Sequence, residues 1–380
     1  MMGFGSVPPQ DPHKALHSAE GALRGEPTGR ADNPVVKVWD VAWLVFEKPD
    51  LDRAERFARD FGFTVTSRTP DELRLRGTFP GTDAVVIRRG PRAGFVGPVF
   101  QAQERPDLDR LAARTGARVK PLPGHRDGAV VELLDPSGLA VAVVHGADVH
   151  PVLPDQKPLV LNTGTSWPRV NTTQRPAREP SRIQRLGHFV FETPHFTTAL
   201  NWYQETLGLL VSDFQFLPRE RALGPTMAFM RCDRGGQAAD HHTMALHLSP
   251  RTGYVHSAYQ VADLDALAAG GAYLAERGYH RAWGIGRHIL GSQIFDYWRD
   301  PDRLMVEHFT DGDRFDASVQ PGWAPMTASG LAQWGPPVTR DFLGTNPSPA
   351  LLREVYSALR EPDSEVTAKR LLSLVRAMSS

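Results

Sequence analysis

The sequence predicts an α+β fold of four βαβββ units, which form two paired-unit half-barrel domains followed by a helical C-terminal tail. The main observation is an internal repeat. V-A-W-L-V-F in the first half matches L-G-H-F-V-F in the second, F-V-G-P-V-F-Q matches Y-V-H-S-A-Y-Q, and D-P-S-G-L-A-V-A matches D-P-D-R-L-M-V-E. Matched segments in the same order indicate a duplicated architecture. Within each half, β-branched and aromatic runs alternate with stretches of helical periodicity, which is typical of mixed units.

The first half illustrates how each unit is recognised. A β-branched and aromatic run at 35–46 predicts a strand. The following stretch predicts a helix, because Asp50 can cap it and Gly62 can end it. Its apolar positions recur at helical spacing, at Leu51, Ala54, Phe57 and Phe61.

The chain divides by composition into five segments. Prolines and asparagines interrupt the pattern near residue 150, and the stretch 320–337 is loop-like. Two amphipathic helix candidates follow, and we expect this tail to pack on the core or on a partner subunit. The predicted segments are a disordered arm (1–33), an N-terminal metal-free domain (34–148), a linker (149–181), a C-terminal catalytic metal-binding domain (182–315) and the tail (316–380).

The charge balance argues against some classes of partner. Lys and Arg together number 43, as do Asp and Glu, so the formal net charge is zero. A nucleic-acid or membrane-surface protein needs a basic footprint, so neither partner is expected. The single cysteine, Cys232, allows no internal disulfide, and no apolar run reaches the ~18 residues of a membrane span. We therefore expect a cytoplasmic protein.

The repeat singles out three candidate metal ligands. At three matched positions the second half carries His188, His256 and Glu307. The first half carries side chains that cannot hold a metal, namely Trp43, Gly97 and Ala142. Two histidines and one carboxylate are the ligand set of non-haem Fe(II) oxygenases. The sequence therefore predicts one metal site, in the second half.

The second half resembles the type I extradiol ring-cleaving catechol dioxygenases of the vicinal oxygen chelate (glyoxalase/bleomycin resistance/dioxygenase) superfamily. The resemblance spans roughly residues 35–315. Its specific part is G-R-H, then Tyr297, then D-P-D-R-L-M-V-E, with H-H-T-M-A-L upstream. It implies Fe(II), or Mn(II) as the alternative ion, held by the three ligands named above. It also implies His242 as the acid/base, and His288 and Tyr297 as residues that hydrogen-bond the substrate.

The implied activity is cleavage of the aromatic ring of a catechol-type substrate with O2, with insertion of both oxygen atoms, in an enzyme that commonly forms homo-oligomers. The sequence departs from the family at Asp296, where an apolar residue is commoner, and at Arg303, where the turn usually ends in glycine.

Three other functions remain open. A 4-hydroxyphenylpyruvate-type dioxygenase, or another metal-dependent enzyme of the superfamily, would share the ligands but has no need of His242, His288 and Tyr297 together. A redox-silent lyase or isomerase typically carries an additional carboxylate in the other half. A non-enzymatic binding module would not need the three ligands.

The sequence also gives structural expectations for several polar residues near the candidate ligands. His241 and His242 are adjacent, so we expect one of them to face the site. His308 should point away from the face that Glu307 occupies. Asp296 and Arg299 are interpreted as a solvated pair.

Overall fold

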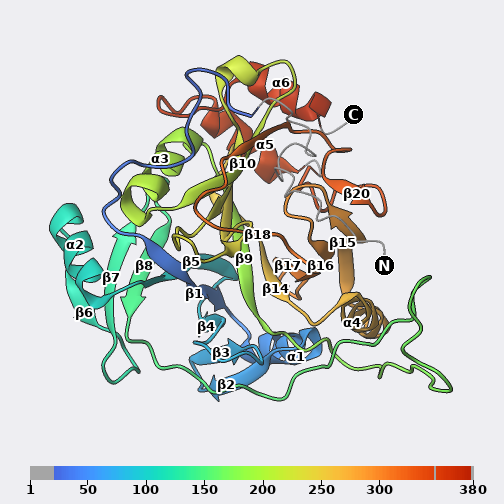
Figure 1. Ribbon diagram of the computed structural model, residues 1–380. Helices are drawn as coiled ribbons and strands as arrows, with labels where there is room; N and C mark the ends of the chain where they lie inside the picture. The colour runs from blue at the N-terminus through green and yellow to red at the C-terminus, as the bar shows by residue number, and fades with distance from the viewer. Residues whose placement is uncertain (1–20, 346–347, 378–380) are drawn as a thin grey trace, which may run out of the picture.

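The computed structural model describes residues 21–345 and 348–377, and it confirms the predicted α+β fold (Figure 1). The N-terminal half forms an eight-stranded sheet with the strand order β2-β3-β4-β1-β5-β8-β7-β6. Its elements are β1 (Val38–Lys48), α1 (Leu51–Phe61), β2 (Thr64–Arg68), β3 (Glu72–Arg76), β4 (Val85–Arg89), β5 (Gly94–Ala102), α2 (Arg105–Thr115), β6 (Val119–Pro121), β7 (Ala129–Leu134) and β8 (Ala140–His145).

The C-terminal half repeats this order and extends it at both edges. Its ten-stranded sheet runs β19-β10-β11-β13-β9-β14-β17-β16-β15-β20. The elements are β9 (Arg185–Thr193), α3 (Phe196–Leu207), β10 (Leu210–Phe216), η1 (Arg221–Leu223), β11 (Met227–Arg231), β13 (Met244–Leu248), β14 (Gly253–Gln260), α4 (Leu264–Glu276), β15 (His280–His288), β16 (Ile294–Arg299), β17 (Met305–Thr310), β19 (Gly322–Pro325) and β20 (Ala332–Trp334). A separate two-stranded sheet joins β12 (Ala239–Asp240) to β18 (Arg314–Phe315).

Strand register confirms the internal repeat residue by residue. Val45 of β1 lies opposite Gly97 of β5, and Val190 of β9 lies opposite His256 of β14. The other matched pairs agree in the same way, with Val99 opposite Ala142 and Ala258 opposite Glu307. A one-residue slip would send a side chain to the other face of its sheet, so this agreement places the matched positions on equivalent faces.

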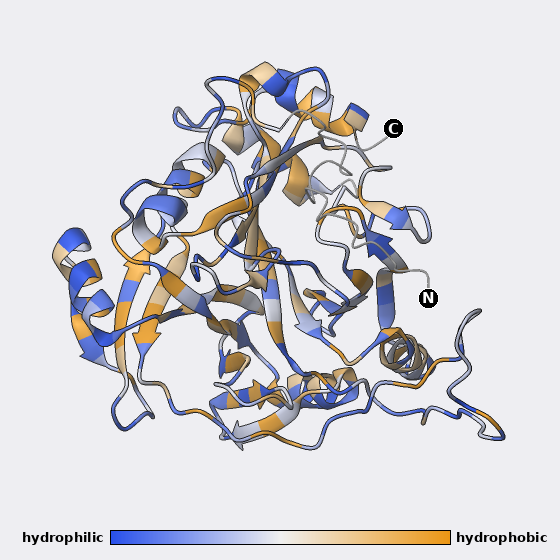
Figure 2. Cartoon of the chain, viewed as in Figure 1, coloured by the Kyte–Doolittle hydropathy of each residue, from blue (hydrophilic) through white to orange (hydrophobic). Residues whose placement is uncertain are grey.

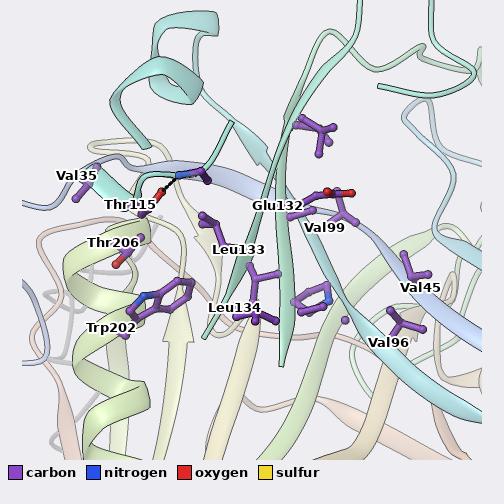
Figure 3. Close-up of a pocket in the computed structure, with 18 of the residues that line it drawn as sticks. Val35, Val45, Val96, Val99, Thr115, Glu132, Leu133, Leu134, Trp202 and Thr206 are labelled. Carbon is purple, nitrogen blue, oxygen red and sulfur yellow. Dashed lines mark hydrogen bonds between the residues drawn. The ribbon is translucent and has the colours of Figure 1, made fainter. Parts of the chain in front are cut away.

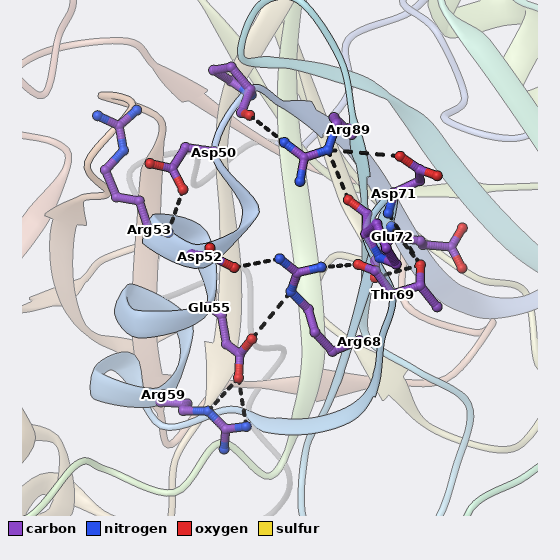
Figure 4. Close-up of polar contacts among 12 residues, drawn as sticks. Asp50, Asp52, Arg53, Glu55, Arg59, Arg68, Thr69, Asp71, Glu72 and Arg89 are labelled. Atoms are coloured by element: carbon purple, nitrogen blue, oxygen red, sulfur yellow. Dashed lines mark hydrogen bonds and ion pairs between the residues drawn. The ribbon is translucent and has the colours of Figure 1, made fainter.

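The first helix forms where the sequence predicts it. The Asp50 side chain accepts a hydrogen bond from the backbone N–H of Arg53, and Gly62 ends the helix in the left-handed region at φ 108°. On its solvent side, Arg68 of β2 pairs with Asp52 and Glu55 (Figure 4). Apolar residues lie along the central strands while the peripheral loops are mainly hydrophilic (Figure 2).

The two Asp-Pro turns join the halves in a pseudo-symmetric way. In the N-terminal half, Asp135 Oδ2 accepts a hydrogen bond of 3.1 Å from the hydroxyl of Tyr203 on α3. In the C-terminal half, Asp300 contacts the ammonium of Lys48, the last residue of β1. Arg303 takes the left-handed backbone at φ 70°, as its counterpart Gly138 does at φ 80°. The substitution of arginine for the usual glycine therefore leaves the turn geometry unchanged.

Some elements were not predicted from the sequence. The interpretation of 320–337 as a loop is wrong in part, because β19 and β20 lie within it and extend the sheet. Strands this short make most of their contacts with distant segments, and β19 pairs in parallel with β10, about a hundred residues away. Strands β6, β10 and β15 also had no counterpart in the prediction.

The tail packs on the C-terminal half. Its helices are α5 (Pro349–Ala358) and α6 (Ala368–Ala377); α6 lies at the top of Figure 1 and α5 below it. Glu365 accepts hydrogen bonds from the backbone N–H and hydroxyl of Thr197, and His195 contacts Glu361 at 3.0 Å. Of the two predicted alternatives, packing on the core or on a partner subunit, the structure shows packing on the core.

The segments outside the two sheets are irregular. Residues 1–20 of the predicted arm lie outside the described residues, whereas Arg30 donates a hydrogen bond to the Ala317 carbonyl and Glu26 pairs with Arg221. The segment 149–181 is largely without regular structure. The domain boundaries stay a prediction. In the described part of the chain, no helix has the length and apolarity to cross a membrane.

Candidate metal centre and active site

The three predicted ligands meet on the C-terminal sheet. His188 comes from β9, His256 from β14 and Glu307 from β17, three strands that are neighbours in the sheet. Their potential ligand atoms all lie within 4.8 Å of one another, and each histidine Nε2 is 3.4 Å from Glu307 Oε2. Two adjacent ligand atoms that bind one ion at about 2.1 Å lie roughly 3 Å apart. The two 3.4 Å separations would therefore have to shorten only slightly for these residues to bind a cation.

Unsatisfied polar atoms show that these residues fit a metal ion. The atoms concerned are both carboxylate oxygens of Glu307, both ring nitrogens of His256 and Nδ1 of His188, and all are buried without a hydrogen-bond partner among the described residues. Glu307 itself is 0% exposed. Burying a carboxylate without compensation is costly, and a divalent cation would supply that compensation. His188, His256 and Glu307 are the residues that would hold it.

The matched positions of the N-terminal half line an open hollow instead. Trp43, Gly97 and Ala142 all border a cavity of about 1130 Å³, which is lined mostly by apolar residues, with valine the commonest. Figure 3 shows this hollow, with Trp202 of α3 facing its strands. Equivalent strand positions thus carry a buried polar cluster in the C-terminal half and border a mostly apolar hollow in the N-terminal half.

His242 lies against the ligand cluster. Its ring centroid is 4.0 Å from that of His188, and the Phe229 ring packs edge-on against it at 5.2 Å. Burial, reinforced by the neighbouring histidines with His188 first among them, holds the pKa of His242 well below its usual value. His241 and His242 lie in the connection between β12 and β13, and it is His242 that lines the cavity beside the ligands.

His288 and Tyr297 form a hydrogen-bonded pair that lines the same cavity, and the Tyr297 ring centroid lies 5.1 Å from that of His256. His288 Nδ1 lies 2.8 Å from the Leu331 carbonyl oxygen, so this nitrogen carries the proton. Its Nε2 is then the acceptor for the Tyr297 hydroxyl at 2.9 Å. Burial and then the charge of Glu307 raise the pKa of Tyr297 well above its usual value, so the hydroxyl keeps its proton.

A cavity of about 70 Å³ connects these groups. It is lined by His188, His256, His242, His288 and Tyr297, together with apolar side chains that include Phe229, Leu331 and Phe342. About 10–15 Å³ of such space holds one water molecule, so the cavity accepts a small ligand. The sequence did not predict the three apolar residues as site residues. Leu331 and Phe342 belong to the irregular segment after residue 316, whose pattern carries no signal.

The structural interpretations have mixed outcomes. His308 points away from the site as expected, with Nε2 2.8 Å from the Phe61 carbonyl oxygen. The interpretation of Asp296 and Arg299 as a solvated pair is wrong. Asp296 is 0% exposed and pairs with Arg281, and burial raises the pKa of its carboxyl to about 7. Its neighbours in the sheet enclose the side chain, and a local pattern cannot reveal this.

Comparison with known proteins places this geometry in a family. The model of the Glyoxalase/Bleomycin resistance protein/Dioxygenase superfamily matches residues 185–308, the segment that contains all three candidate ligands. Metapyrocatechase 2 from Cupriavidus necator is 31% identical over 335 residues, which is 86% of this chain and 98% of that protein. The chain belongs to the extradiol ring-cleaving dioxygenases of this superfamily.

Other relatives agree with the family. Biphenyl-2,3-diol 1,2-dioxygenase from Pseudomonas sp. (strain KKS102) is 26% identical over 160 residues, 40% of this chain and 49% of that one. A variant of homoprotocatechuate 2,3-dioxygenase from B. fuscum superposes with a TM-score of 0.66 at 18% identity, covering 83% of this chain and 84% of that one.

The fold by itself does not separate activities within the superfamily. A Mn(II)-bound glyoxalase from Novosphingobium aromaticivorans superposes equally well, with a TM-score of 0.66 at 20% identity over 88% of this chain and 99% of that one. The sequence relatives therefore carry the assignment to the extradiol dioxygenases.

Proposed function

We propose that this extradiol dioxygenase uses Fe(II), with Mn(II) as the alternative ion, to cleave the ring of a catechol-type substrate with O2 and to insert both oxygen atoms. The observation that carries the proposal is one cavity that is lined by both histidines of the two-histidine, one-carboxylate cluster, by His242 and by the His288–Tyr297 pair. Bound Fe(II) would supply open coordination positions for two reactants and a path for electrons between them.

The side chains around the cluster suit a catechol. Phe229, Leu331 and Phe342 form an apolar wall for an aromatic ring. The Tyr297 hydroxyl oxygen can still accept a hydrogen bond from a substrate hydroxyl, and its bond of 2.9 Å to His288 holds it in place. His288, which also contacts the Leu331 carbonyl, would act on the substrate through Tyr297.

His242 is proposed as the acid/base. Its low pKa keeps the imidazole neutral at pH 7, so it can accept a proton from a substrate hydroxyl and later return it to an oxygen of the product. This role separates the proposal from a 4-hydroxyphenylpyruvate-type enzyme, which has no need of His242, His288 and Tyr297 around one metal. Homo-oligomer formation and the absence of nucleic-acid partners stay predictions.

Oxygen uptake tests the proposal. The full-length protein is loaded anaerobically with Fe(II) and offered mono- and bicyclic catechols, while oxygen consumption and the coloured ring-opened product are recorded. We expect uptake with at least one catechol. Metal binding without uptake across the panel would refute the proposal.

Two histidine variants test the assigned roles, with a third as the control. His256→Ala should abolish iron retention. His242→Phe should keep its iron but turn over about 10²–10⁴-fold more slowly, the usual contribution of acid/base catalysis. His247→Ala is the matched control, since His247 lies outside the cavity, 3.7 Å from Glu192. Normal turnover of the His242→Phe variant would remove that residue from the mechanism.

A further inference from the structure

A chain of three buried side chains leads from β10 to the cavity. Asp213 Oδ2 lies 2.6 Å from His241 Nε2, and His241 Nδ1 lies 3.0 Å from His242 Nδ1. Asp213 and His241 are each 1% exposed and His242 is 4% exposed. The comparisons and the sequence motif give no role to Asp213 or His241.

We propose that Asp213 and His241 are positioning residues that fix the tautomer of His242, so that its unprotonated Nε2 faces the cavity. This inference rests on the role proposed above for His242.

The direction of the hydrogen bonds follows from the carboxylate end. An ionised carboxylate can only accept, so His241 Nε2 must carry a proton. The buried guanidinium of Arg231 interacts electrostatically with Asp213, and a nearby positive charge favours the ionised form of a carboxyl group.

The position of the proton on His241 then determines which ring nitrogen of His242 carries a proton. In the proposed arrangement His241 is neutral, with one N–H at Nε2 and one lone pair, so that His241 Nδ1 is an acceptor. The nitrogen 3.0 Å away, His242 Nδ1, must donate to it and carries the proton of that ring. The lone pair of His242 is left on Nε2, which makes no hydrogen bond to the protein among the described residues.

The His241 main chain is held on both sides, which gives the arrangement a defined geometry. Its N–H donates to the Asp313 carbonyl at 2.8 Å, and its carbonyl accepts from the Ser212 hydroxyl at 2.5 Å. Gly291, at φ 81°, approaches the His241 ring so closely that an added Cβ would lie 3.0 Å from Nδ1. The ring therefore has little freedom to rotate away from His242.

The tautomer matters because the two forms of His242 offer opposite groups to a substrate. With Nδ1 protonated, Nε2 can accept a hydrogen bond and then the proton of a catechol hydroxyl. The Nδ1–H continues to donate to His241 throughout, so the chain does not have to reverse. With Nε2 protonated, the same position presents an N–H and cannot accept that proton.

Two variants of His241 separate positioning from packing. His241→Asn keeps an oxygen acceptor near the position of Nδ1, whereas His241→Leu fills space without one. We expect His241→Leu to keep its iron and a KM within about 3-fold, and to lose about 10–100-fold in kcat; His241→Asn should recover most of that loss.

Nitrogen NMR of histidine-labelled, Zn(II)-loaded full-length protein gives a readout that does not depend on turnover. We expect His242 to be protonated at Nδ1 in the wild type and in His241→Asn, and at Nε2 in His241→Leu. Protonation at Nε2 in the wild type, or equal kcat in the Leu and Asn variants, would overturn the inference. Absence of oxygen uptake by the wild type would refute the proposed function but leave the NMR result to decide the tautomer.

Discussion

Replacing Lys48 by methionine should destabilise the protein through an ion pair between its two halves. The Lys48 side chain is 5% exposed, and its ammonium contacts Asp300 and lies 3.3 Å from Asp302. Arg53 also pairs with Asp302, but Asp300 has no second cation in contact with it among the described residues. The variant therefore leaves one buried carboxylate with only the backbone N–H groups of Asp302 and Leu304 as partners.

The expected decrease in the free energy of unfolding follows from the cost of breaking a buried ion pair. Removal of one partner costs about 3–5 kcal/mol, and methionine keeps most of the apolar contacts of the lysine stem. Burial raises the pKa of Asp300 and Lys48 lowers it, so the pKa rises further in the variant.

The sign of the pH dependence follows from this shift. A carboxyl whose pKa is higher in the folded than in the unfolded state destabilises the fold increasingly as pH rises above the unfolded value of about 3.9. The variant should therefore lose more stability at pH 8 than at pH 5, because at pH 5 partial protonation of Asp300 reduces the cost of the unpaired buried carboxylate.

Urea unfolding at the two pH values measures the effect. Adding Asp300→Asn to the Lys48→Met background should recover most of the stability lost at pH 8. Lys37→Met is the control, because Lys37 is half exposed and its 2.6 Å pair with Asp233 should contribute at most about 1 kcal/mol. A loss for Lys48→Met below that of the control, or one equal at both pH values, would refute the reasoning.

Three further predictions concern the turn, the metal and its surroundings. Arg303→Gly should raise the free energy of unfolding in urea by about 0.5–1 kcal/mol, because glycine relieves the left-handed backbone at φ 70°; a destabilised variant would contradict this. His308→Phe should cost about 1–3 kcal/mol through the lost hydrogen bond to the Phe61 carbonyl while its iron content stays at the wild-type level; lost iron would mean that His308 supports the site. Chelation should lower the thermal midpoint and Fe(II) should restore it, since an ion at 100–1000 times its Kd contributes about 3–4 kcal/mol, and Glu307→Gln should show no such response.

The three candidate metal ligands, which the structure brings together, could be predicted because the two halves of the chain can be compared with each other. Trp43 and His188 occupy matched strand positions, and the duplication turns a single sequence into two aligned ones. Asp213 had no such support. It lies on β10, a strand that the sequence did not predict, and its partner is 28 residues away. Its contact with His241 depends on how β10 and the β12–β13 connection come together, which local periodicity does not encode.

The cover of the cavity was beyond prediction for a related reason. Leu331 lies just before β20, which pairs with β15 through Ala332 and Trp334. Phe342 packs on Trp283 and Tyr297 with ring centroids 4.6 and 4.8 Å apart. These positions are fixed by tertiary contacts, and a stretch of mixed Gly, Pro and apolar residues carries no local preference strong enough to reveal them.

The comparison of the two halves gives a physical reason for the position of the candidate metal cluster in the C-terminal half. Equivalent strand positions carry His188, His256 and Glu307 in one half and border an open hollow of about 1130 Å³ in the other. The C-terminal half differs by having β19, β20 and the segment up to residue 345, which contribute Leu331 and Phe342 to the walls of its small cavity. Enclosure strengthens electrostatic interactions and limits the access of water to a reacting centre. The same segment supplies the Leu331 carbonyl that sets the tautomer of His288, so the cover and the orientation of a site residue depend on one stretch of chain. If the same three residues stood at the matched positions of the N-terminal sheet, they would have neither this cover nor a neighbouring carbonyl to orient a site histidine.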